Sequence, residues 1–115
     1  MVRRRAFVPA RGDAVLISLN PRAGHEQAGR RPAVVVSSAA YNKKVGLALL
    51  CPITSRTKGY PFEALIPPGL KIGGAVLSDQ VKCLYCKARN VTFICKLPAL
   101  VVGEVLGKLN TLLQE

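Results

Sequence analysis

The chain has 115 residues, which is room for one domain with one hydrophobic core. Half of the residues are hydrophobic, which excludes a chain too polar to fold, and no apolar run is long enough to cross a bilayer. The formal net charge of +11 attracts polyanions, so nucleic acid, an acidic protein or an anionic membrane surface would each suit it. A basic surface without a particular partner is the simpler alternative. A membrane partner is the weaker alternative, because the sequence contains no basic amphipathic helix. Because no apolar segment follows the basic start, we expect no signal peptide and a soluble, cytoplasmic protein.

Short apolar segments separated by turn residues follow one another along most of the chain, a pattern typical of strands. The expected strands are residues 13–19, 32–37, 45–53, 61–66, 75–77, 80–85 and 91–96, and residues 39–44 are expected to form a turn or coil. From Pro98 the spacing of the apolar residues becomes helical, and this spacing predicts a C-terminal helix. The residues in that stripe are Val102, Val105, Leu106, Leu109, Leu112 and Leu113. The sequence therefore predicts a mainly β protein with a C-terminal α-helix, built as a small barrel or sandwich.

Four cysteines, Cys51, Cys83, Cys86 and Cys95, lie in the apolar segments. Cys83 and Cys86 form a CxxC pair, which raises the possibility of a zinc or redox site. In a strand, however, residues three apart point to opposite faces, which is unsuitable for joint ligation. We therefore expect buried free thiols that act as small hydrophobic side chains.

A polar, glycine-bearing loop over residues 20–30 ends just before a buried strand, and Glu26, Arg30 and Arg31 lie near the start of that strand. A guanidinium beside a phosphate can neutralise charge that develops on the phosphoryl oxygens. The alternative is a solvated loop in which Glu26 and Arg30 form a surface ion pair worth under about 1 kcal/mol.

A second polar cluster follows the strand at 45–53, where Thr54, Ser55 and Lys58 could hold phosphate oxygens. Asp79 and Gln80 form a third polar point. Ordinary turn chemistry is the alternative at both places, because Ser, Thr and Asp are common turn residues.

Several kinds of catalytic site find no support in the sequence. His25 is the only histidine, no phosphate-binding glycine motif occurs, and the carboxylates are scattered, so a two-metal nuclease site is not expected. Cleavage of a phosphodiester would then have to proceed without metal or another cofactor. RNA allows this because its own 2′-hydroxyl can be the nucleophile, while the protein moves a proton and stabilises the transition state.

Residues 26–37, EQAGRRPAVVVS, resemble the EQAGxRPAVVxS signature of the MazF/PemK toxins. Further matches keep the order of that family between Arg11 and Arg89. They are Gly12-Asp13, Tyr41-Asn42-Lys43, Pro52-Ile53-Thr54-Ser55, Lys58-Gly59-Tyr60-Pro61-Phe62-Glu63 and Ser78-Asp79-Gln80-Val81-Lys82. The resemblance implies one toxin domain over residues 1–115, folded as a small SH3-like or CcdB-like antiparallel β-barrel that forms a homodimer.

The resemblance also implies an activity, which is metal-independent cleavage of single-stranded RNA at short specific sequences. The products would carry a 2′,3′-cyclic phosphate and a 5′-hydroxyl, and a MazE-like antitoxin with an acidic C-terminal segment would block the RNA groove. Carried over by motif, the catalytic residues would be Arg31, Thr54 and Glu26. The residues expected to contact RNA are Ser55, Lys58, Gln80, Arg30 and Asn42.

Three questions stay open at the level of sequence. Arginine is a natural electrostatic clamp or acid but a poor base, so Glu26 or His25 would have to accept the 2′-hydroxyl proton. The basic segment at residues 3–5 is either a nucleic-acid contact or a disordered end. The same fold could also be a CcdB-like toxin that binds a protein such as gyrase, or a nucleic-acid-binding module without catalysis. Those CcdB-like toxins lack the Arg–Thr pair, whereas Arg31 and Thr54 are both present here.

Overall fold

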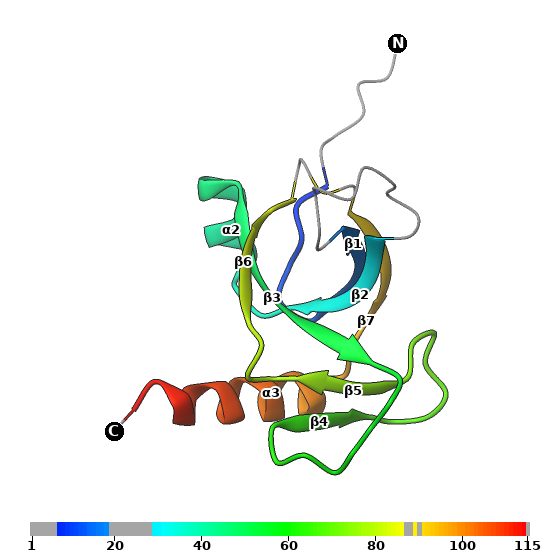
Figure 1. Cartoon of the computed structure of the whole chain (residues 1–115). Helices are drawn as coiled ribbons and strands as arrows, with labels where there is room; N and C mark the ends of the chain where they lie inside the picture. Colours follow the sequence, from blue (N-terminus) through cyan, green and yellow to red (C-terminus); the bar gives the residue numbers. More distant parts are fainter. Residues whose placement is uncertain (1–6, 19–28, 87–88, 90, 115) are drawn as a thin grey trace.

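The computed structural model describes residues 7–18, 29–86, 89 and 91–114. Its elements are β1 (Asp13–Ser18), β2 (Arg30–Val35), α2 (Ala39–Val45), β3 (Leu47–Thr54), β4 (Glu63–Ile66), β5 (Gly74–Leu77), β6 (Lys82–Tyr85), β7 (Thr92–Lys96) and α3 (Ala99–Leu112). The strands form a curled antiparallel half-barrel, and α3 lies beside the β4–β5 hairpin (Figure 1). The predicted class, mainly β with a C-terminal helix, is confirmed.

Strand β3 joins the two parts of the sheet. The strand order of the sheet is β4-β5-β3-β2-β1-β7, and β6 also pairs with β3. Along one edge β3 pairs with β2, with Val35 opposite Leu50. Along its other edge it pairs first with β6 and then, through its last two residues, with β5, where Thr54 lies opposite Ala75. Thr54 therefore stands where the curled part of the sheet meets the β4–β5 hairpin.

Side chains on the two faces of the sheet fill two separate cores. Because successive residues of a strand point to opposite faces, Val34 of β2 packs in one core while Ala33 and Val35 pack in the other. The first core lies against α3 and includes Val101 and Val105 of that helix. The second core packs β1, β2, β3 and β6 together. Burial on both faces explains why residues 32–36 are almost continuously apolar instead of alternating.

Helix α2 corrects the expectation of a turn or coil at residues 39–44. The hydroxyl of Ser38 caps its first turn by accepting a hydrogen bond from the Tyr41 N–H at 3.2 Å. Gly46, at φ +83°, ends the helix in the left-handed conformation that glycine adopts without strain. These two end signals were present in the sequence.

Helix α3 begins at Ala99, directly after Pro98, as the spacing predicts. Its fully buried residues are Val101 and Val105, so the stripe that faces the core starts one residue earlier than expected. Leu112 and Leu113 of the expected stripe are 48% and 76% exposed, which is a departure from the prediction. No helix in the described part of the chain is long and apolar enough to cross a membrane.

The cysteines match the prediction only in part. All four thiols are free, and Cys51 is fully buried in the first core, as expected. Cys86 and Cys95 are half-buried. Cys83 is exposed, so the prediction of burial was wrong there, because β6 buries only Leu84 of its four residues.

Candidate functional site

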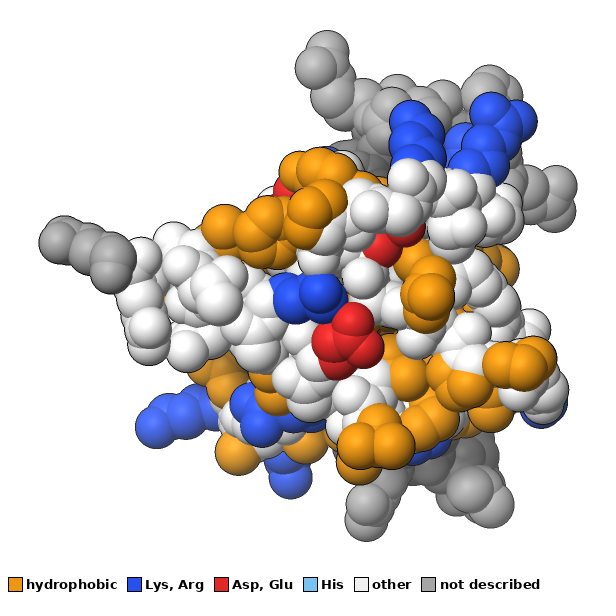
Figure 2. All heavy atoms as spheres, turned by 90° about the horizontal axis from the view of Figure 1, so that it is seen from below, with side chains coloured by type: hydrophobic (Ala, Val, Ile, Leu, Met, Phe, Trp, Pro, Cys, Tyr) orange, Lys and Arg blue, Asp and Glu red, His pale blue; other side chains and the backbone are white. Residues whose placement is uncertain are grey.

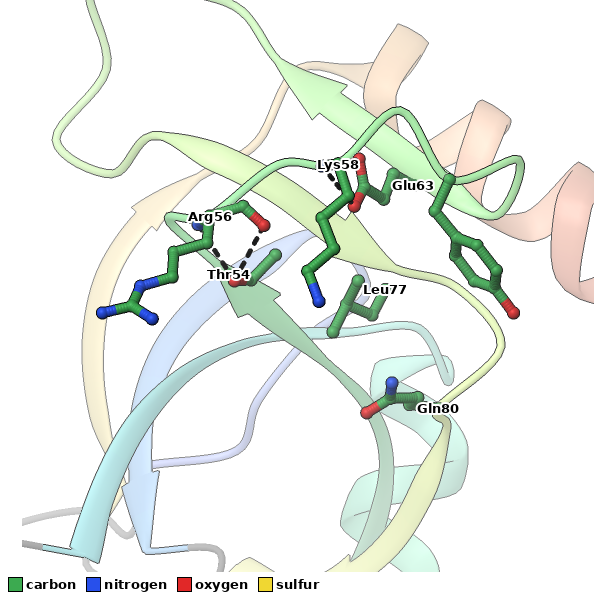
Figure 3. Close-up of a pocket in the computed structure, with 7 residues that line it drawn as sticks. Thr54, Arg56, Lys58, Glu63, Leu77 and Gln80 are labelled. Carbon is green, nitrogen blue, oxygen red and sulfur yellow. Dashed lines mark hydrogen bonds between the residues drawn. The ribbon is translucent and has the colours of Figure 1, made fainter.

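A cleft of about 460 Å³ lies at the end of β3, under the loop that leads to β4. Its walls come from this loop, from β5 and from the turn before β6 (Figure 3). The lining residues are Thr54, Arg56, Lys58, Tyr60, Glu63, Leu77 and Gln80. The fold thus brings Gln80 to Thr54 and Lys58, two predicted site residues that lie close together in the sequence.

The Thr54 hydroxyl is oriented by the backbone of Arg56. Its oxygen accepts a hydrogen bond from the Arg56 N–H at 3.1 Å, and the hydroxyl has a longer contact of 3.5 Å to the Arg56 carbonyl. The neighbouring strand approaches closely at this point. A Cβ on Gly74 would lie 2.0 Å from the Thr54 carbonyl oxygen, and Gly74 has φ +106°. Only glycine therefore allows β5 to pair with the end of β3 here.

Lys58, from the loop, and Glu63, the first residue of β4, form one part of the wall. The Glu63 carboxylate, only 8% exposed, accepts hydrogen bonds from the N–H groups of Lys58, at 3.0 and 3.2 Å, and of Gly59, at 3.2 Å. The side chain of Lys58 extends away from this carboxylate toward the space between Thr54 and Leu77 (Figure 3). Its ammonium is therefore directed into the cleft.

Tyr60 and Asp79 fasten the loop to the turn before β6. The Tyr60 hydroxyl donates a hydrogen bond to Asp79 Oδ2 at 2.8 Å. This hydrogen bond and the charge of Asp79 raise the pKa of Tyr60, so the phenol stays protonated over the ordinary pH range. Gln80 follows directly and is exposed at the rim of the cleft. The polar point expected at residues 79–80 is thus both a turn and part of the cleft.

Arg31 is exposed on β2 and is not among the described residues that line the cleft. The pairing of β2 with β3 sets Ala33 opposite Pro52 and Val35 opposite Leu50. Arg31 and Thr54 each lie two residues beyond the Ala33–Pro52 pair, which is the last pair at that end. Because side chains alternate along a strand, Arg31 and Thr54 project from the same side of the sheet on neighbouring strands.

The remaining predicted residues have different surroundings. The guanidinium of Arg30 donates to the Leu16 carbonyl, at 3.4 Å, and to the Thr92 hydroxyl, so it ties β2 to β1 and β7. Ser55 is exposed at the start of the loop after β3. Glu26, His25 and the basic segment at residues 3–5 lie outside the described residues.

Asn42 is 4% exposed and is enclosed by its own helix and the start of the chain. Its amide donates to the Pro9 carbonyl at 2.7 Å and to the Ser37 carbonyl at 3.3 Å, and its oxygen accepts from the Ser37 hydroxyl at 2.5 Å. Through these hydrogen bonds the side chain of Asn42 holds α2 against Pro9 and Ser37. We therefore leave Asn42 out of the candidate RNA surface.

Arg56 and Glu63 are cleft residues to which sequence reasoning gave no site role. The cationic side chains within residues 55–59 were the sequence signal that could have indicated a site role for Arg56. Glu63 belongs to the matched KGYPFE segment, but nothing in a local pattern tells that its carboxylate turns inward. Within the described ranges, no three His, Cys, Asp or Glu side chains come together as metal ligands.

The arrangement as a whole is suited to an anion. Lys58 and Arg56 supply positive charge, while Thr54 and Gln80 supply neutral hydrogen-bond donors at the same cleft. The class of protein that this fold and cleft define is a small β half-barrel with a cationic cleft at the end of its central strand.

Comparison with known proteins identifies the family. Residues 10–113 match the family described as PemK-like, MazF-like toxin of type II toxin–antitoxin system. The chain is 45% identical over 86 residues to the endoribonuclease toxin MazF of Escherichia coli K12, which covers 75% of this chain and 77% of that protein. It resembles the crystal structure of MazF from Deinococcus radiodurans with a TM-score of 0.84 and 48% identity, covering 94% of this chain and 98% of the other. A MazE–MazF crystal structure from the same organism matches with a TM-score of 0.83 and 42% identity, covering 94% and 97%. The chain belongs to the PemK-like, MazF-like toxin family.

Proposed function

We propose that this chain is the toxin of a toxin–antitoxin pair and that it acts as an endoribonuclease on single-stranded RNA. It cuts at short specific sequences without metal and leaves a 2′,3′-cyclic phosphate and a 5′-hydroxyl. The observation that carries the proposal is the cleft at the end of β3, where Thr54, Lys58 and Gln80 meet. The relatives named endoribonucleases support the same activity.

In the proposed reaction the 2′-hydroxyl oxygen attacks the adjacent phosphorus and the bond to the 5′-oxygen breaks. Negative charge builds up on the phosphoryl oxygens in the transition state, and the guanidinium of Arg31 neutralises that charge. The Thr54 hydroxyl donates a hydrogen bond to the same oxygens. Its present contact to the Arg56 carbonyl is long, at 3.5 Å, so the hydroxyl hydrogen can turn to a phosphate at little cost.

Two proton transfers complete the reaction. The 2′-hydroxyl proton goes to a base, and the departing 5′-oxygen gains a proton to become a hydroxyl. Arg31 suits the second role better than the first, because a guanidinium holds its proton at ordinary pH. Glu26 and His25 are the candidates for the base, and both precede Arg31 in the same loop of the sequence.

The proposed partner is an antitoxin with an acidic C-terminal segment that binds over the cationic cleft in the cytoplasm. The net charge of +11 provides the attraction, and MazE–MazF complexes have been solved for a relative. Deletion of the acidic segment from the cognate antitoxin should abolish neutralisation. Full neutralisation by the truncated antitoxin would refute this part of the proposal.

The chain is also proposed to form a homodimer. The face that carries α3 has hydrophobic side chains spread across it, with most Lys and Arg near its rim (Figure 2). Exposed leucines of β4, of α3 and of its C-cap contribute to the apolar surface, among them Leu65 at 63% and Leu113 at 76%. Exposed apolar surface of this kind is typical of an interface. Sedimentation equilibrium of the purified protein should give twice the mass of one chain.

Incubation with a long single-stranded RNA in EDTA tests the activity. The wild type should give discrete fragments that end in cyclic phosphate, and Arg31→Ala should give none. Lys44→Ala is the matched control, because it also removes one positive charge but from the exposed surface of α2. Intact RNA with folded, antitoxin-free wild type would contradict the proposal and favour a CcdB-like toxin that binds a protein.

A further inference from the structure

Glu63 is a buried carboxylate in the wall of a cleft that is suited to an anion. It is 8% exposed, and it has no ion pair among the described residues, whose ion pairs join Lys96 to Asp13 and Lys108 to Glu104. A buried charge is costly unless hydrogen bonds compensate it. Here the compensation comes from the N–H groups of Lys58 and Gly59, which make all three hydrogen bonds found for the carboxylate.

These two N–H groups come from one tight turn. Gly59 has φ +74°, which lets successive N–H groups converge on one anion. The rest of the loop is fixed independently, because the Tyr60 hydroxyl bonds to Asp79 and the Glu63 N–H donates to the Tyr60 carbonyl at 3.0 Å. The carboxylate of Glu63 is therefore the contact that fixes the backbone at Lys58.

The ammonium of Lys58 does not pair with this nearby carboxylate. In the close-up the side chain of Lys58 leaves the loop beside the Glu63 carboxylate and runs toward Thr54 and Leu77 (Figure 3). A lysine next to a carboxylate ordinarily gains by forming an ion pair with it. Because the backbone amides occupy the carboxylate oxygens, the ammonium is left available for a ligand in the cleft.

We propose that Glu63 is a positioning residue, which holds the main chain of Lys58 so that the ammonium binds an RNA phosphate. The inference rests on the proposed function, since it takes single-stranded RNA as the ligand. Glu63 touches neither the RNA nor the reacting atoms. It acts only through the location of Lys58.

This role predicts an effect opposite in sign to simple electrostatics. Glu63→Gln removes a negative charge from the wall of the cleft, and by charge alone RNA should then bind more tightly. The new side-chain NH₂ group, however, would face the N–H of Lys58, where the carboxylate now accepts at 3.0 Å. The turn at Lys58 and Gly59 would open, and the ammonium of Lys58 would no longer be held in the cleft. We expect RNA binding about tenfold weaker, equivalent to one lost hydrogen bond to a charged group.

The binding test uses fluorescein-labelled 2′-O-methyl RNA of mixed sequence, which cannot be cleaved through its 2′-oxygen. Glu63→Gln and Lys58→Ala should each weaken binding about tenfold and lower the salt slope by about 0.7. The double variant should bind no more weakly than Lys58→Ala alone, because both changes remove the same contact. The matched control is Glu104→Gln, which removes the same charge from an exposed site on α3 and should bind RNA at least as well as wild type.

Hydrogen exchange of the Lys58 and Gly59 amides, followed by NMR, tests the positioning itself. In Glu63→Gln these two amides should exchange faster while the amides of β1 to β3 remain protected, which also shows that the variant is folded. On a cleavable RNA the variant should raise KM about tenfold and change kcat little. Glu63→Asp, which keeps the charge on a shorter side chain, should recover part of the affinity.

Three results would overturn the proposal. Glu63→Gln would bind RNA as tightly as Glu104→Gln, or the losses from Glu63→Gln and Lys58→Ala would add in full, or the Lys58 amide would stay protected. Each of these is read against a wild type that does bind RNA. A wild type that neither binds nor cleaves RNA would instead refute the proposed function, and the two failures are thus distinguishable.

Discussion

Thr54→Val removes the hydroxyl of Thr54 and keeps the shape of the side chain. In the folded protein the hydroxyl makes one good hydrogen bond, from the Arg56 N–H at 3.1 Å, and one long contact of 3.5 Å. Loss of such a partly exposed neutral bond costs about 1 kcal/mol of unfolding free energy. For a domain of this size that is a fall in Tm of about 4 °C. The variant should therefore remain folded at 25 °C.

The expected effect of the same change on catalysis is larger. Removing one donor to a charged transition state costs roughly a hundredfold in rate, which is about 2.7 kcal/mol. This exceeds the cost to folding, so the two effects can be separated by measurement. In the proposed reaction Arg31 and Thr54 act on the same phosphoryl oxygens. The double variant Arg31→Ala/Thr54→Val should then be about as slow as Arg31→Ala alone.

The assay is single-turnover cleavage of an RNA oligonucleotide that contains a mapped cut site, with enzyme in excess. Thr54→Ser keeps the hydroxyl and serves as the control, and it should cleave within about tenfold of wild type. Urea unfolding of each variant gives its stability in parallel. If Thr54→Val cleaves at the wild-type rate while losing about 1 kcal/mol of stability, the hydroxyl only forms the turn and the catalytic reasoning is refuted.

Four further predictions concern stability and reactivity. Gly74→Ala should cost about 2 kcal/mol or more, because its Cβ would meet the Thr54 carbonyl at 2.0 Å, and thermal unfolding should show a fall in Tm of roughly 8 °C. Burial, together with a neighbouring carboxylate, raises the pKa of Cys51 from 9.0 to about 11. The resulting stability is complete below pH 9 and is lost as the pH rises toward 11, so Tm should fall less over that range in Cys51→Ala. Iodoacetamide at pH 8 should modify the exposed Cys83 in the native protein and leave Cys51 unmodified. Asn42→Ala removes three buried hydrogen bonds and should lower the unfolding free energy by about 2 kcal/mol in urea titrations.

The strands and the C-terminal helix could be predicted because burial leaves a periodic record in the sequence. Helix α2 could not be found this way, since its seven residues are mostly polar or small and bury only Asn42. Its end signals, Ser38 and Gly46, were the better guide. Helix α3 shows a different limit. Spacing identified the helix, but the end that carries Leu112 and Leu113 extends past the core of one chain.

The cleft could be predicted only where a motif pointed to it. Thr54 and Lys58 are close in sequence, and the matched segments added Gln80, which the fold brings to the same place. The role of Glu63 in the cleft could not be predicted, because a carboxylate that accepts hydrogen bonds from backbone N–H groups has the same sequence signal as one that faces water. Asn42 shows the opposite limit, since its segment matches the family while its amide is enclosed by Ser37 and Pro9.

The most direct test of the central claim is cleavage, in EDTA, of an RNA oligonucleotide with a single 2′-deoxynucleotide on the 5′ side of the mapped cut site. The account makes the 2′-hydroxyl at that position the nucleophile, with Arg31 and Thr54 stabilising the transition state. It predicts that the substituted RNA stays intact while the all-ribose RNA is cut to a cyclic phosphate. Cleavage of both RNAs at the same rate would contradict the account, because the nucleophile would then have to be water or a side chain.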